Sequence, residues 1–295
     1  MAAAANIGPA IDLAQIYPEG HARLTRVRDG VMLYNRNDQF VGRALELYGE
    51  YCELRLDLFR QIVQPGDIVV DVGAYIGVNT LGVAKIVGKT GAVIAMELQR
   101  LINQMLGANM ALNGLTNVYT PLIAAGEEAG QIVVPILSPS VENNYSALGI
   151  RDQEWESGDA VPVNTIDSFE LRRCRLLIID VEGMELEALR GAEATLATCA
   201  PILYVANHRR DKSPALISHL FDRGYQLYWD VTPIWRPGNF AGNDTNQFPE
   251  TVVPGMVGIP PGDPTRIEGR KVASPTDNWS GGAPVRTFVP ETQKS

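Results

Sequence analysis

A short run of small and acidic residues, 71–77, stands between an apolar stretch and a helical pattern. It reads Asp71-Val72-Gly73-Ala74-Tyr75-Ile76-Gly77. Small residues at such a turn let the backbone approach a ligand closely, and the N-terminus of the following helix offers free N–H groups. Glu97 ends the next apolar stretch, where an acidic side chain can accept hydrogen bonds from both hydroxyls of a ribose. Together the two features predict a cofactor that contains a nucleoside.

The turn itself discriminates between two classes of cofactor. Dinucleotide sites normally carry G-x-G-x-x-G, whereas this chain has Gly73-x-x-x-Gly77 and lacks the middle glycine that admits a pyrophosphate. Asp71 at the strand end would repel a phosphate, but it suits a cationic amine such as that of S-adenosylmethionine. The pattern therefore favours a methyl donor. A dinucleotide, and a tight turn that binds no ligand, are the alternatives.

Further titratable residues follow two later apolar stretches. Asp180 and Glu182 come directly after residues 176–179, and His208 comes shortly after residues 202–205. Ligands of open α/β sheets lie outside the carboxyl ends of the strands, so these side chains are candidates for acceptor binding, proton removal or metal ligation. A histidine titrates near neutral pH and can act as a general base. The alternatives are helix capping for the acids and a structural role for His208.

Strand and helix patterns alternate along most of the chain. This alternation predicts βαβ units, a parallel sheet and right-handed crossovers. The predicted strands are 67–72, 92–96, 118–124, 132–135, 176–180, 202–205, 225–229 and 251–259. The predicted helices are 43–63, 78–87, 99–113, 182–196 and 213–223. Residues 23–33 have the pattern of a hairpin, and the polar stretch 138–158 that of a long loop.

Composition and charge exclude several other classes of protein. The net charge of −9 disfavours a nucleic-acid substrate, because an acidic surface repels a phosphate backbone. We find no signal-peptide pattern at the N-terminus and no apolar run of roughly 20 residues, so we expect a cytoplasmic protein without a membrane partner. The three cysteines are widely spaced and predict neither a zinc site nor a disulfide framework.

Several blocks of residues occur in an order that resembles the FkbM-type methyltransferases. The resemblance runs from about Leu45 to Ile259. The blocks are 48–50, 65–74, 97–100, 109–114, 179–185, 189–192, 212–213, 228–229 and 239–240. The resemblance implies a class I methyltransferase fold, S-adenosylmethionine as the cofactor, and O-methylation of a hydroxyl on a sugar or polyketide-like small molecule.

The chain departs from the usual pattern of that family at six positions. It has Tyr75 in place of asparagine, Leu98 in place of proline, Ile178 in place of lysine, Ala206 in place of glutamate, His208 in place of aspartate and Asp230 in place of histidine. Most of these changes fall on the acceptor side of the presumed site. They leave a second function open, that of a catalytically weak relative that binds the cofactor in a binding or regulatory role.

The resemblance and the patterns together give a full set of predicted site residues. The catalytic residues are Asp180, Glu182 and His208. The cofactor-binding residues are Asp71, Gly73, Ala74, Tyr75, Gly77, Asn79, Glu97, Leu98, Ala124 and Asp180. The acceptor-binding residues are Asn144, Tyr145, Asn207 and Asp230. We expect no metal, because Ala206 and His208 replace two carboxylates that the family usually offers.

The exchanged residues at positions 208 and 230 suggest a hypothesis about acid–base chemistry. His208 and Asp230 would lie within hydrogen-bond reach, and the carboxylate would raise the basicity of the imidazole. The alternative is drift at two surface loop positions.

The predicted fold is a doubly wound α/β fold with a mostly parallel, seven-stranded sheet and helices on both faces. Residues 1–42 would form a partly ordered N-terminal extension, residues 43–260 the methyltransferase domain, and residues 261–295 a flexible C-terminal tail, because their composition offers little apolar surface to bury.

Overall fold

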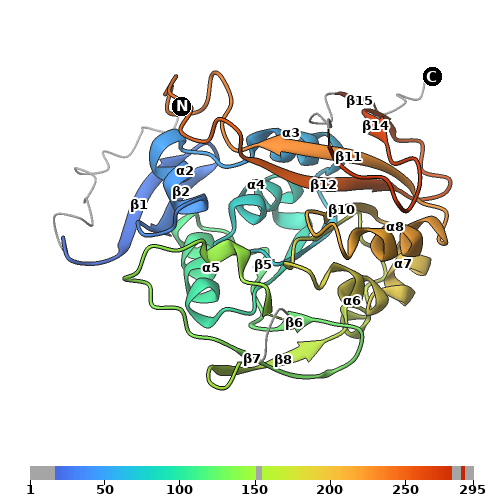
Figure 1. Ribbon diagram of the computed structural model, residues 1–295, viewed down its shortest axis with the longest axis horizontal. Coiled ribbons are helices and arrows are strands. Elements are labelled where there is room, and N and C mark those ends of the chain that lie inside the picture. Colours follow the sequence, from blue (N-terminus) through green and yellow to red (C-terminus); the bar gives the residue numbers. More distant parts are fainter. Residues whose placement is uncertain (1–16, 151–154, 281–286, 290–295) are drawn as a thin grey trace.

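A mostly parallel sheet forms the centre of the protein (Figure 1). The computed structural model describes residues 17–150, 155–280 and 287–289. The sheet has eight strands in the order β14-β11-β12-β10-β9-β3-β4-β5. These are β3 (Ile68–Val72), β4 (Ala92–Met96), β5 (Val118–Tyr119), β9 (Leu176–Ile179), β10 (Ile202–Ala206), β11 (Gln226–Pro233), β12 (Val252–Ile259) and β14 (Arg270–Lys271). Five neighbouring strands of the sheet, β5, β4, β3, β9 and β10, pair in parallel. Strand β12 is antiparallel to both β10 and β11.

Apolar side chains on both faces of the central strands explain why helices cover both faces of the sheet. Leu176 and Ile178 belong to the cluster that packs against α3 (Glu53–Ile62), α4 (Val78–Val87) and α5 (Arg100–Leu112). Leu177 and Ile179 belong to the cluster under α6 (Glu185–Arg190), α7 (Glu193–Cys199) and α8 (Ser213–Phe221). Strands buried on both faces are typical of parallel sheets. The predicted doubly wound fold is confirmed, with one strand more than the seven expected.

Two predicted helices are each divided in two. The pattern 43–63 forms α2 (Val41–Tyr48) and α3, because Gly49 and Cys52 between them adopt left-handed backbone conformations that end one helix and begin the next. The pattern 182–196 forms α6 and α7. The helical spacing of apolar residues continues across both breaks, so this spacing alone could not show where one helix ends and the next begins.

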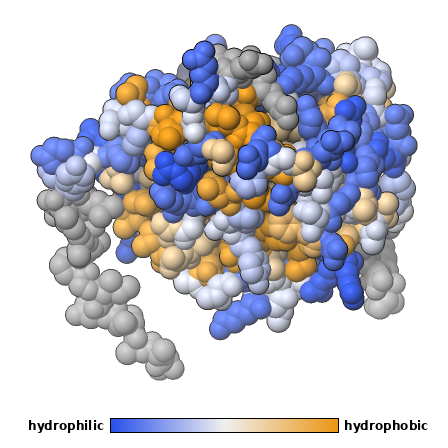
Figure 2. Space-filling model, turned by 90° about the horizontal axis from the view of Figure 1, so that it is seen from below, coloured by the Kyte–Doolittle hydropathy of each residue, from blue (hydrophilic) through white to orange (hydrophobic). Residues whose placement is uncertain are grey.

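A second, smaller sheet takes up the end of predicted strand 118–124 and most of predicted strand 132–135, together with residues 159–164, which the sequence did not mark as a strand. Only Val118–Tyr119 joins the main sheet, while β6 (Ala124–Ala125) pairs with β8 (Asp159–Asn164), next to β7 (Gly130–Val134). Within the predicted loop 138–158, residues Tyr145–Ala147 form a short 3-10 helix, and residues 151–154 lie outside the described residues. Figure 2 views the protein from below Figure 1, where β7 and β8 lie, and shows apolar patches separated by polar side chains.

The chain ends contribute more structure than their composition indicates. The hairpin of β1 (Ala22–Val27) and β2 (Gly30–Asn35) is held to α5 by the side chains of Asn109 and Asn113, which bond to the β2 backbone. Residues 1–16 lie outside the described residues. Among the helices that the structure describes, each is too short or too polar to cross a bilayer.

The prediction of a flexible tail over 261–295 is wrong for the described part of that segment. Strand β14 pairs with β11, β13 (Arg266–Glu268) pairs with β15 (Thr287–Val289), and the Trp229 indole donates to Asp277 at 3.1 Å. Backbone pairing and the buried side chains of Thr265 and Val272 hold a segment that composition alone does not mark as structured. Residues 281–286 and 290–295 lie outside the description.

Candidate active site

Two adjoining pockets open at the carboxyl ends of β3, β4, β9 and β10. The Glu97 pocket is lined by the ends of β3 and β4 and by residues near Ala124, and the His208 pocket by α3, α4 and the start of β12. Five residues line both pockets: Gly73, Tyr75, Ser146, Asp180 and Glu182. The two pockets therefore share one wall, which the predicted glycine-containing turn and the residues after β9 form.

The turn after β3 depends on glycine for the packing of the sheet. Gly73 has a φ of 82°, and a Cβ at this position would overlap the backbone carbonyl oxygen of Asp180. Gly77, with a φ of 91°, lies so close to α5 that a Cβ would meet Leu106 and Met110. Gly73, predicted to bind the cofactor, lines both pockets, whereas Gly77 lines neither. The role of Gly77 is to let α5 pack against the start of α4.

Asp71 was predicted to bind the cofactor directly, and the structure contradicts this. Its side chain is buried beneath the turn and accepts a hydrogen bond of 2.6 Å from the Thr80 hydroxyl. It lines neither pocket. Burial raises the pKa of Asp71 to about 6. Asp71 thus holds the first turn of α4 in place instead of facing a ligand.

Glu97 is presented at the end of β4 as the sequence predicted. Its Oε1 accepts the backbone N–H of Gln99 at 2.7 Å, and its Oε2 accepts that of Tyr75 at 3.0 Å. Each carboxylate oxygen has a second lone pair for a further donor. Burial raises the pKa of Glu97 to about 7. A buried carboxylate with two oxygens free to accept fits the paired hydroxyls of a ribose.

Tyr75 stands where the related family has asparagine, and it adopts a φ of 52°. This left-handed conformation is unusual for a bulky residue, whereas asparagine tolerates it. The Tyr75 hydroxyl donates to the buried Asp38 carboxylate at 2.9 Å, which ties the turn to the segment before α2. Four further predicted cofactor residues line the site: Leu98 and Ala124 in the Glu97 pocket, and Ala74 and Asn79 in the His208 pocket.

Asp180 is held by Arg55, a residue that the sequence analysis missed. The Arg55 Nη1 lies 3.2 Å from Oδ2 of Asp180, and its guanidinium carbon lies 4.8 Å from the centre of the Tyr204 ring. Arg55 is 2% exposed, and its Nε and Nη2 have no hydrogen-bond partner among the described residues. Its spacing from Phe59 and Ile62 places it on the buried face of α3, which was the available signal.

His208 forms an ion pair with Glu182 across the mouth of the site. The His208 Nε2 lies 2.8 Å from Oε2 of Glu182, and this contact raises the pKa of His208 to about 9 although burial opposes it. At neutral pH the imidazole is therefore protonated and has no lone pair with which to accept a proton. The predicted role of His208 as a general base does not fit this arrangement.

Three predicted acceptor residues lie elsewhere. Asp230 is buried in β11 and accepts from the hydroxyls of Tyr204 and Thr232, so both the pairing with His208 and the surface-loop alternative are wrong. The Asn207 amide lies 3.2 Å from the Met256 sulfur, inside the sheet. Tyr145 lines a separate cavity, and its hydroxyl donates to the Ser138 carbonyl at 2.6 Å. These positions in the sequence did not reveal which way each side chain turns.

The remaining predicted residues do meet at the site. Asn144 lines the His208 pocket together with Asp180, Glu182 and His208. Across residues 17–150, 155–280 and 287–289, no three His, Cys, Asp or Glu side chains gather closely enough to hold a metal ion.

Comparison with known proteins identifies one family. The model for the methyltransferase FkbM domain matches residues 71–227. A search of curated proteins found no match.

Three solved structures that match this chain are distant from it in sequence. A methyltransferase FkbM from Methylobacillus flagellatus KT is 19% identical, with 66% of this chain and 43% of that chain covered and a TM-score of 0.45. A SAM-dependent O-methyltransferase from Thermotoga maritima is 11% identical, with 84% and 82% covered and a TM-score of 0.43. A putative methyltransferase from Streptococcus mutans, in complex with SAH, is 13% identical, with 70% and 96% covered and a TM-score of 0.40. The chain thus spans less than half the length of the first of these relatives.

Proposed function

The chain belongs to the FkbM methyltransferase family, and we propose that it transfers a methyl group from S-adenosylmethionine to a hydroxyl oxygen of a small molecule in the His208 pocket. One observation carries the proposal: the Glu97 carboxylate is oriented by two backbone N–H groups in a pocket that shares Asp180 and Glu182 with the His208 pocket. Cofactor and acceptor would meet at this shared wall. A sugar or polyketide-like acceptor is what the family membership favours, and the net charge of −9 disfavours nucleic acid.

The residues of the Glu97 pocket suit the nucleoside part of the cofactor. Glu97 would accept both ribose hydroxyls, and the apolar side chains of Leu98 and Ala124 would contact the base. The bound cofactor supplies a methyl group that is already activated on a positively charged sulfur. The protein needs only to align the acceptor oxygen and remove its proton.

Asp180 is the residue that we assign to proton removal. Its side chain is 25% exposed and lines both pockets, and Arg55 holds one carboxylate oxygen. His208 is protonated by its contact with Glu182, so it contributes a positive charge and a fixed orientation. With the cofactor held on one side, the Asp180 carboxylate, anchored by Arg55 on the other side, would act as the general base for methyl transfer to oxygen.

The test is the formation of S-adenosylhomocysteine from S-adenosylmethionine with a panel of sugars and hydroxylated polyketides. Asp180→Asn is expected to lower kcat about 10²–10⁴-fold, the contribution of a positioned base, while calorimetric binding of S-adenosylhomocysteine stays within a few fold. Asp244→Asn, at an exposed loop position, is the matched control and should behave as the wild type.

Two outcomes would redirect the assignment. Full activity in Asp180→Asn would remove Asp180 as the base. Tight cofactor binding with no turnover on any acceptor would favour the cofactor-binding relative with a binding or regulatory role.

A further inference from the structure

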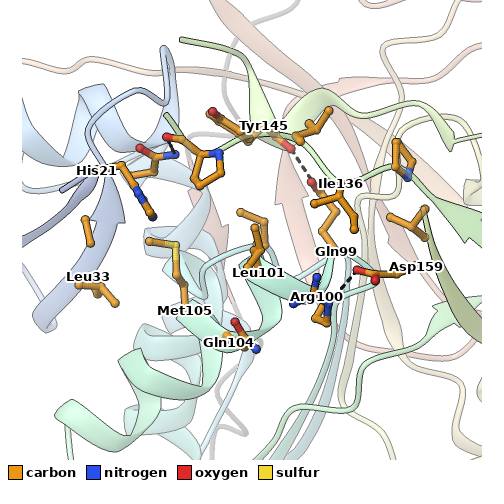
Figure 3. Close-up of a pocket in the computed structure, with 17 residues that line it drawn as sticks. His21, Leu33, Gln99, Arg100, Leu101, Gln104, Met105, Ile136, Tyr145 and Asp159 are labelled. Carbon is orange, nitrogen blue, oxygen red and sulfur yellow. Dashed lines mark hydrogen bonds and ion pairs between the residues drawn. The ribbon is translucent and has the colours of Figure 1, made fainter. Parts of the chain in front are cut away.

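A third cavity lies outside the two pockets of the candidate site. It is enclosed by the β1–β2 hairpin, the first turns of α5 and the segment 134–139, and its volume is about 300 Å³ (Figure 3). Small-molecule sites usually have volumes of about 300–1,000 Å³ and mostly apolar walls. The apolar side chains that line it include Leu33, Leu101, Met105, Ile136 and Leu137. The cavity thus has the size and the wall of a small-molecule site.

The polar groups around the cavity define what it can bind. The Arg100 Nε donates to Asp159 at 2.9 Å, so the charged pair on one side of the cavity is internally compensated. The His21 imidazole and the Gln104 amide also line the cavity, and each can form a hydrogen bond with a hydroxyl or carbonyl group. Such a wall favours an uncharged molecule, because an ion would leave water without an opposite charge to meet it.

The wall between this cavity and the candidate site is one residue thick. Gln99 lines both the cavity and the Glu97 pocket, and its backbone N–H donates to Glu97. The Gln99 side chain donates to the Tyr145 carbonyl at 3.0 Å (Figure 3). Tyr145 lines the cavity, while its neighbours Asn144 and Ser146 line the His208 pocket. A molecule packed against Gln99 and Tyr145 therefore touches the residue that orients the Glu97 carboxylate and the neighbour of two residues that line the His208 pocket.

We propose that this cavity is a second ligand site, which takes a neutral, largely apolar small molecule with one hydroxyl or carbonyl group. Its occupancy is coupled to the Glu97 pocket through Gln99 and Tyr145. Because coupling between two sites is reciprocal, a ligand in the cavity changes the cofactor affinity by the same factor by which the cofactor changes the affinity of the cavity.

The test uses the full chain and the neutral fluorophore N-phenyl-1-naphthylamine. We expect saturable binding of one dye per chain, displacement by 1-decanol at lower concentrations than by decanoate, and no competitive displacement by S-adenosylhomocysteine. Met105→Trp fills the cavity and should weaken dye binding at least tenfold. Leu112→Trp lies on the same helix, is 50% exposed and does not line the cavity, so it should bind the dye as the wild type does.

Foldedness is checked by the binding of S-adenosylhomocysteine, and Ile136→Trp, at a 55% exposed lining position, serves as a second filling variant if Met105→Trp does not fold. Equal dye binding by wild type and filling variant, or no saturable binding, would overturn the site. Competitive displacement by S-adenosylhomocysteine would place the dye in the Glu97 pocket and overturn it as well. An unchanged affinity for S-adenosylhomocysteine at saturating 1-decanol would overturn the coupling. These readouts need no methyl transfer, so the proposed activity can fail without affecting them.

Discussion

At the scale of single residues, we predict that Glu97 links cofactor binding to pH. Its pKa of about 7 in the free protein reflects burial, and hydroxyl donors favour the ionised form. We predict that S-adenosylhomocysteine binds up to about tenfold more tightly at pH 8 than at pH 6, since ionisation of Glu97 must precede or accompany binding. Calorimetry across this range measures the effect.

Replacement of Glu97 separates its contribution from those of other titrating groups. Glu97→Gln should weaken binding by roughly 1–3 kcal/mol, the range for hydrogen bonds to charged groups, and should remove most of the pH dependence. Glu128→Gln, at an exposed position, should change neither. A variant at position 97 that keeps the wild-type pH profile would assign the proton to another group, such as Asp71.

His208 and Glu182 make a second prediction at this scale. The imidazole of His208 should titrate in an NMR experiment with a pKa of about 9, and Glu182→Gln should bring it back towards 6.5. Because the folded-state pKa is raised, the stability from this pair is fully present below pH 6.5 and is lost as the pH rises through about 9. His219, whose pKa burial lowers, is the internal control and should not respond to the change at Glu182. A His208 that titrates near 6.5 in the wild type would contradict the ion pair.

At the scale of elements, the turn between β3 and α4 requires glycine for a steric reason. Gly73→Ala adds a Cβ that overlaps the Asp180 carbonyl oxygen, in addition to the cost of a positive φ. Gly66 has a similar φ of 92° but the nearest atom to an added Cβ is at 3.6 Å, so Gly66→Ala measures the conformational cost alone. We predict about 1–3 kcal/mol for Gly66→Ala and at least twice that for Gly73→Ala in urea unfolding. Equal losses would show that backbone strain, and not the contact with the Asp180 carbonyl oxygen, requires glycine at position 73.

At the scale of the whole molecule, the segment after residue 260 closes the far edge of the sheet. Asp277 accepts the Trp229 indole N–H and the backbone N–H of Ala273, and its side chain is 11% exposed. Asp277→Ala should therefore cost about 1–3 kcal/mol and lower Tm by several degrees. Differential scanning calorimetry checks this, with Asp244→Ala at an exposed position as the control. An unchanged Tm would mean that the segment adds nothing to the stability of the sheet.

The sequence by itself determined the alternation of elements, the turn 71–77 and the position of Glu97. Each depends on neighbours in the chain: apolar runs form strands, and small residues form the turn between a strand and a helix. The blocks that resemble one family follow the same order and led to the same cofactor.

Only the tertiary structure decided which side chains meet at the acceptor side. Arg55 reaches Asp180 across 125 positions in the chain, and His208 takes Glu182 rather than Asp230 as its partner. The Asp71 side chain is buried and accepts a hydrogen bond from the Thr80 hydroxyl, and strand β14 of the segment after residue 260 pairs with β11. These contacts follow from how sheet and helices pack. Periodicity can mark the buried face of a helix, as it does for Arg55, but it does not say which distant residue that face meets.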